Sequence, residues 1–201
     1  MSAPCPPRPP SGTSRYTWIV GVVAVLALAY ITLNTLGTDA PGSRGVPKGE
    51  PLPPFAVPLA LSTLEGDAQV DPAKACRVRG PRVLNSCQLA ERGPVAIAFF
   101  ATKSDRCERQ IDVVERVRRR FPGIGFAAVS VRGDRAEVRR QVRRRGWGMP
   151  VGYDHDGAVT NAYAVAICPT ITFAAKGGKV VSTSFSLLGE AALTKRLAAI
   201  R

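Results

Sequence analysis

The cysteines are the residues of this chain with the most evident chemistry. A thiolate can exchange with a disulfide or reduce a peroxide, and both reactions depend on how its surroundings stabilise the anion. Cys5 stands alone near the N-terminus, and four cysteines follow residue 36. An even number in one part of a chain is typical of an oxidising compartment. The four are Cys76, Cys87, Cys107 and Cys168.

Other kinds of chemistry have little support in the sequence. The chain has one histidine, His155, in a turn-like segment that we expect to be exposed to solvent. The ten residues between Cys76 and Cys87 do not match zinc-ligand spacing, so we expect no metal site. No Ser-His-Asp arrangement, phosphate loop or dinucleotide fingerprint occurs, and we expect no cofactor.

The elements around Cys107 are a strand, a short turn and a helix. Residues 94–101 (PVAIAFFA) form a continuous apolar run typical of a strand buried on both faces. The polar turn 102–104 leads into a helix, which we expect Pro122-Gly123 to end. On this helix Cys107 belongs to a series of apolar residues at helical spacing. The other members of this series are Ile111, Val114, Val117 and Phe121.

The remainder of the domain predicts a mixed α/β sheet. A second apolar strand spans 124–131, and Asp134 caps an arginine-rich helix that stops at Gly146. A short segment at 149–153, a turn, a small helix to about 163 and a hairpin around Gly177-Gly178 follow, and an amphipathic helix closes the chain. This order implies helices on both faces of the sheet.

Two blocks resemble the TlpA-like membrane-tethered thiol–disulfide oxidoreductases of the thioredoxin-like superfamily. Residues 99–109 (FFATKSDRCER) are similar to the family's F-W-A-T-W-C-x-P-C-R, and residues 165–173 (VAICPTITF) to its G-V-x-x-x-P-T-T-F. In that family the proline, here Pro169, is cis and lies against the active site. The resemblance implies a thioredoxin-like domain, a protein thiol or disulfide as substrate, and a redox role for the first block.

The first cysteine of the family motif is missing here. Ser104 occupies its position, and a hydroxyl cannot carry out thiol–disulfide exchange, so the usual two-cysteine cycle is not available at this turn. Cys107 remains at the start of the helix, where backbone dipoles favour a thiolate. We hypothesise that Cys107 pairs with Cys168 in the cis-proline loop. The alternative is that Cys107 is a small buried apolar residue and Cys168 a chance neighbour.

Two further functions stay open at this point. Peroxiredoxins place a Thr or Ser three residues ahead of the attacking cysteine, as Ser104 stands to Cys107, although Phe100 replaces the proline expected upstream. Alternatively, the altered turn marks a non-catalytic binding module. We expect Cys76 and Cys87 to form a structural disulfide, and the alternative is that they resolve Cys107 during turnover.

The N-terminal region predicts a single membrane anchor. Residues 17–36 form an uncharged run of 20 residues, about 30 Å of helix, which matches the bilayer core. The rival interpretation is a signal peptide cleaved near Ala27-Leu28-Ala29, but the apolar run continues beyond that site. We expect a disordered cytoplasmic tail at 1–16, an uncleaved signal anchor at 17–36 and a proline-rich spacer at 37–58. Residues 59–201 then form the extracytoplasmic domain.

The chain is strongly basic, with a formal net charge of +13, of which +11 falls after residue 58. Its arginines gather on two predicted helices without interleaved aromatic residues, and no nucleic-acid-binding motif occurs. We therefore expect a solvated basic face and no nucleic-acid partner, with attraction to an anionic membrane surface as a weaker alternative. The arginines are Arg116, Arg118, Arg119, Arg120, Arg139, Arg140, Arg143, Arg144 and Arg145.

Overall fold

The computed structural model describes residues 14–37 and 45–201, and it divides the chain into two units at residue 40. Most of the predicted N-terminal tail, residues 1–13, and part of the predicted spacer, residues 38–44, lie outside the described residues. The two units are considered separately.

The first unit contains one helix, α1 (Ser14–Gly37), which includes the uncharged run. Its side chains from Tyr16 to Thr32 are exposed. Within the part of the chain that the structure describes, no helix is both long enough and apolar enough to cross a membrane. The membrane span over residues 17–36 therefore stays a prediction from the sequence.

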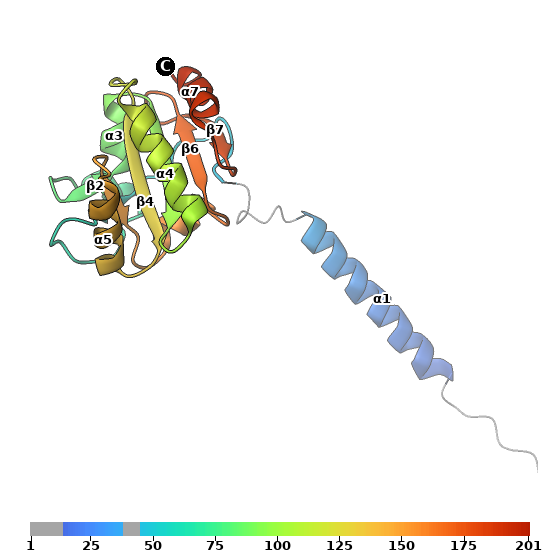
Figure 1. The fold of residues 1–201 in the computed structure, drawn as a ribbon. Helices are drawn as coiled ribbons and strands as arrows, with labels where there is room; N and C mark the ends of the chain where they lie inside the picture. Colours follow the sequence, from blue (N-terminus) through green and yellow to red (C-terminus); the bar gives the residue numbers. More distant parts are fainter. Residues whose placement is uncertain (1–13, 38–44) are drawn as a thin grey trace, which may run out of the picture. The chain divides into compact units, whose positions relative to one another are not determined.

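The second unit is built on a five-stranded mixed sheet in the order β5-β4-β3-β6-β7. Figure 1 labels β4, β6 and β7 of this sheet. The central strand β3 (Val95–Ala101) is parallel to β4 (Gly125–Arg132) on one side and antiparallel to β6 (Thr170–Ala174) on the other. The short β5 (Val151–Tyr153) extends the parallel part, and β7 (Val180–Ser184) completes the hairpin with β6. The mixed α/β thioredoxin-like fold expected from the sequence is confirmed.

Alternate side chains of β3 supply two separate cores. Ala96, Ala98 and Phe100 pack beneath α4 (Asp105–Arg118), α5 (Arg135–Arg145) and α7 (Glu190–Ala198). Figure 1 shows α4 crossing this face with α7 beside it. Val95, Ile97 and Phe99 face the opposite core, to which α3 (Ser86–Arg92) and α6 (Ala158–Ala162) contribute. Helices thus cover both faces, as predicted.

The proline-rich spacer was expected to reach residue 58, and this boundary is wrong. Residues 45–58 are part of the domain: β1 (Ala56–Pro58) pairs with β2 (Val83–Asn85), and the Leu52 N–H donates to the Gly178 carbonyl at 2.7 Å. Phe55 and Val57 have no exposed surface. The apolar residues between the prolines fill the second core, so the proline content conceals a packed segment. A short helix, α2 (Pro72–Ala75), follows before β2.

Replacing Phe55 tests whether this segment belongs to the fold. The ring is fully buried and packs edge to face against the Tyr163 ring, with 5.6 Å between the ring centroids. We expect Phe55→Ala to lower the free energy of unfolding by about 4 kcal/mol because it leaves a cavity in the core. The control Leu61→Ala, at a side chain that is 50% exposed, should change it by less than about 0.5 kcal/mol. Equal effects of the two variants in urea unfolding would contradict the assignment.

Candidate redox site

Ser104 and Cys107 lie at the start of α4, immediately after the turn that follows β3. Ser104 is the N-cap residue, and its carbonyl accepts hydrogen bonds from the N–H groups of Cys107 and Glu108, both at 2.9 Å. Its side chain does not cap the helix. The hydroxyl instead donates to Cys107 Sγ at 3.0 Å. The Ser104 hydroxyl is therefore directed at the Cys107 sulfur.

A buried carboxylate holds the turn ahead of the helix. Lys103 adopts a positive φ of 60°, which is uncommon for a residue with a side chain, and its N–H donates to Glu108 Oε1 at 3.1 Å. Glu108 is 4% exposed, and its other oxygen pairs with Arg145 at 2.7 Å. Asp112 binds the same guanidinium at 2.7 Å. These contacts connect the site turn to the far end of α5.

The pKa of Arg145 reflects this pairing. Burial by itself would lower the pKa of the guanidinium, but the hydrogen bond that it donates to Glu108 and the charge of Asp112 outweigh burial and raise the pKa. Sequence reasoning placed Arg145 on a solvated face and overlooked Glu108. The available signal was an acidic residue in the first turn of the site helix, within a chain rich in arginine.

Other arginines of the predicted basic face also have structural partners. Arg139 donates to the carbonyl groups of Ala60 and Ser62, which anchors the loop after β1 to α5. Arg118 pairs with Glu115 at 2.7 Å, and Glu115 also accepts the N–H groups of Gly148 and Met149. The expectation of a merely solvated face is therefore wrong for these side chains, because each satisfies groups within the fold.

Cys168 and Pro169 lie in the loop between α6 and β6, and the peptide bond between them is cis. Because β6 is antiparallel to β3, with Thr170 opposite Phe99, this loop meets the end of β3 from which the site turn begins. Cys168 Sγ lies 3.6 Å from the Phe99 carbonyl oxygen. Pro169 is buried, whereas the neighbouring Ile167 is 53% exposed.

The start of α4 and the loop before β6 bring Cys107 and Cys168 into a disulfide. The cysteines are 61 residues apart in the sequence, and their Cα atoms are 5.6 Å apart, within the usual range for a disulfide. Cys107 is 2% exposed and Cys168 is half-buried. Ser104, Cys107, Cys168 and Pro169, the four residues that the sequence singled out for catalysis, thus come together at one place.

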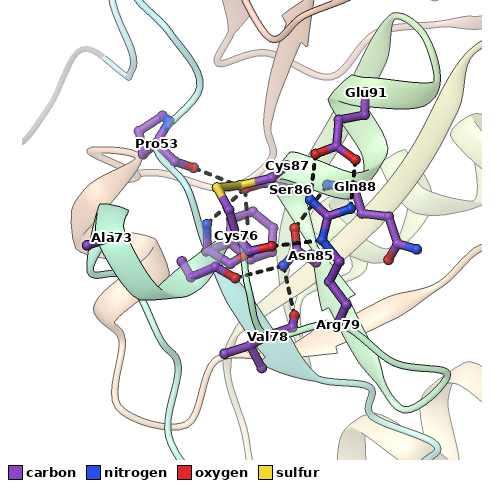
Figure 2. The surroundings of a disulfide bond; sticks show 12 residues. Pro53, Ala73, Cys76, Val78, Arg79, Asn85, Ser86, Cys87, Gln88 and Glu91 are labelled. Atoms are coloured by element: carbon purple, nitrogen blue, oxygen red, sulfur yellow. Dashed lines mark hydrogen bonds and ion pairs between the residues drawn. A yellow bond between two sulfur atoms is a disulfide. The ribbon is translucent and has the colours of Figure 1, made fainter.

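Cys76 and Cys87 form a second disulfide in a different setting. It joins the end of α2 to the first turn of α3, with Cα atoms 5.4 Å apart (Figure 2). Asn85 supports it: its side-chain amide donates to the carbonyls of Ala75 and Val78, each at 2.8 Å, and its oxygen caps α3. Figure 2 also shows the bidentate pair of Arg79 and Glu91 beside it.

His155 is exposed, and its Nδ1 lies 2.9 Å from Asp67 Oδ1. This contact involves no cysteine of either disulfide. Among the described residues, no group of three or more His, Cys, Asp or Glu side chains could hold a metal ion.

Comparison with known proteins establishes the fold and no closer relationship. No protein-family model matches the sequence, and no curated protein matches it. Solved structures do match. One is a secreted disulfide oxidoreductase of Mycobacterium tuberculosis homologous to E. coli DsbE, with a TM-score of 0.54 and 18% identity over 59% of this chain and 89% of that one.

Two other solved structures share more of the fold. A thiol:disulfide interchange protein of the thioredoxin family from Chlorobium tepidum matches with a TM-score of 0.61 and 15% identity, over 77% of this chain and 98% of that one. The peroxidoxin BcpB of Mycobacterium tuberculosis matches with a TM-score of 0.59 and 17% identity, over 79% and 99%. At these identities the likeness shows a common fold, and the activity has to be argued from the site.

Removing the Cys76–Cys87 disulfide separates its two possible roles. The double variant Cys76→Ala/Cys87→Ala should lower the free energy of unfolding by about 3 kcal/mol, because the bond restricts the unfolded chain. If the bond is structural, the rate at which a dithiol opens the Cys107–Cys168 bond, per folded molecule, stays unchanged. A large loss of that rate with stability retained would instead assign these cysteines to the resolution of Cys107.

Proposed function

We propose that this protein is a membrane-anchored, extracytoplasmic thiol–disulfide oxidoreductase whose redox couple is Cys107 and Cys168. The observation that supports it is the bond between the start of α4 and the cis-proline loop, with the Ser104 hydroxyl on one of its sulfurs. This arrangement replaces the couple within one helical turn that the absent first cysteine would have formed.

The reaction needs no group beyond the two sulfurs and the substrate. A substrate dithiol gives up two electrons and two protons and becomes a disulfide. The Cys107–Cys168 bond takes up both electrons and opens, and the protons pass to the reduced cysteines or to solvent. A protein carrying paired thiols or a disulfide is accordingly the proposed partner. Return to the oxidised state requires a disulfide or quinone-type oxidant of the compartment.

Thiol peroxidase activity is the second candidate, and the 3.0 Å contact between Ser104 Oγ and Cys107 Sγ favours it. In that reaction the Cys107 thiolate attacks a peroxide oxygen and becomes a sulfenic acid, with release of water or an alcohol. The Cys168 thiol then displaces water from that sulfur, and the same disulfide results. The two activities differ in the substrate consumed, so they can be measured separately.

A paired assay with cysteine variants tests the proposal. We expect the oxidised full chain in detergent to oxidise a dithiol peptide, with loss of the Cys107–Cys168 bond in mass mapping. Cys107→Ser and Cys168→Ser should each abolish this oxidation because neither can form the bond, and Cys5→Ser should retain it. Peroxide consumption by the reduced protein, lost in Cys107→Ser, would favour the peroxidase. No activity in either assay, with all variants alike, would indicate a binding module.

Anchoring and orientation form a separate part of the proposal and rest on the uncharged run at residues 17–36. We expect the full chain to stay in the membrane pellet after carbonate extraction. A membrane-impermeant maleimide should label Cys5 only after lysis, and Cys5→Ser should remove that label. It should label Ser186→Cys, at an exposed residue of the domain, in intact cells. The reverse labelling pattern, or release by carbonate, would overturn this part.

A further inference from the structure

The two sulfurs of the Cys107–Cys168 bond differ in how a substrate can reach them. Cys107 belongs to the core beneath α4 and is 2% exposed. Cys168 is half-buried and packs against that core from outside its fully buried set. The residues before it, Ala166 and Ile167, are exposed. A thiol carried by a protein can therefore approach Cys168 more readily than Cys107.

The polar groups around the two sulfurs also differ, and they favour a negative charge on Cys107 over one on Cys168. Cys107 Sγ accepts the Ser104 hydroxyl at 3.0 Å and lies in the first turn of a 14-residue helix, and both features stabilise a negative charge on it. Cys168 Sγ lies 3.6 Å from the Phe99 carbonyl oxygen. An oxygen at that position favours a protonated thiol, which can donate to it, over a thiolate.

From these two asymmetries we infer that substrate thiolates attack Cys168, that Cys107 is the leaving thiolate, and that Ser104 is a catalytic residue stabilising the charge on Cys107. This inference rests on the proposed oxidoreductase function and specifies how its site works. It reverses the roles implied by the family resemblance, in which the exposed sulfur belongs to the helix turn. Here the exposed sulfur belongs to the cis-proline loop.

The exchange proceeds in two balanced steps. A substrate thiolate forms a bond to Cys168 Sγ, the Cys107–Cys168 bond breaks, and its electron pair leaves with Cys107 as a thiolate beside the Ser104 hydroxyl. A second substrate thiolate then attacks the substrate sulfur of the mixed disulfide. The substrate disulfide forms, and Cys168 departs as a thiolate that takes a proton and can donate to the Phe99 carbonyl.

A preferred direction follows from this arrangement. Stabilising Cys107 as a thiolate stabilises the reduced protein, which makes the oxidised form the better oxidant. In the reverse direction the buried thiolate is poorly accessible, and the accessible Cys168 is held as a thiol. The site is therefore built to introduce disulfides into substrates rather than to remove them.

Acid trapping of the mixed disulfide tests which sulfur is attacked. The oxidised full chain, in the Cys5→Ser background and in detergent, is mixed with a peptide that carries one thiol, quenched in acid and digested with pepsin. Mass spectrometry should find the peptide on Cys168 in at least about ten molecules for each one on Cys107. A majority on Cys107 would overturn the inference while leaving the oxidoreductase function intact. Absence of any exchange would instead count against the proposed function.

Variants of Ser104 test its role by a readout that folding alone would not change. In Cys168→Ser protein, the thiolate absorbance of Cys107 should titrate about one pH unit higher after Ser104→Ala, since a hydrogen bond to the anion is lost. In the protein that keeps both Cys107 and Cys168, the redox equilibrium with glutathione should shift about tenfold toward the oxidised form. Ser104→Thr should restore both values because it keeps the hydroxyl.

Ser186→Ala, at an exposed serine remote in sequence from the turn, is the matched control and should change neither value. The Ser104 side chain makes no capping hydrogen bond, so the helix should keep its far-UV circular dichroism in Ser104→Ala. Identical titrations and equilibria for Ser104→Ala and Ser186→Ala would overturn the role assigned to Ser104.

Discussion

The antiparallel pairing of β6 with β3 is the constraint on which the rest of the site depends. It places Thr170 opposite Phe99. The loop that carries Cys168 and Pro169 therefore lies beside the C-terminal end of β3, which the turn and α4 follow. Residues 61 positions apart thereby come within disulfide range. Without this pairing Cys107 would be an isolated thiol at a helix start, and the Ser104 hydroxyl would contact a lone thiol in place of a disulfide sulfur.

The sheet and its helices also support the two cysteines to different degrees. Phe99 and Phe100, the residues before the turn, have no exposed surface and enter opposite cores. Glu108 then holds the turn from the helix side through the Lys103 N–H and is itself fixed by Arg145. The sulfur of Cys107 is thus held by groups on β3, α4 and α5, whereas Cys168 is on a loop whose outer side is open. This difference in support matches the difference in exposure.

Much of this could be predicted from the sequence, and what could not has a physical reason. The apolar runs of β3 and β4, the Asp134 cap and the Gly146 stop follow local rules and were found within a residue or so. Bringing Cys168 near Cys107 required the family resemblance, because no local pattern relates residues so distant in sequence. Phe55 and Glu108 were overlooked because their roles depend on partners elsewhere, Tyr163 for the first and Arg145 for the second.

The contrast between the two disulfides sharpens the assignment of function. Cys76 and Cys87 close a short loop. The side-chain amide of Asn85 donates to the carbonyl of Ala75 at the end of α2 and to that of Val78 within the loop, so the bond and the hydrogen bonds hold the same geometry. Cys107 and Cys168 instead join two elements already positioned by β3 and β6, so their bond is not needed to bring them together. A bond that the fold does not require can open and close without loss of structure. That independence is what a redox couple needs, and it supports the proposal that Cys107 and Cys168 carry the chemistry.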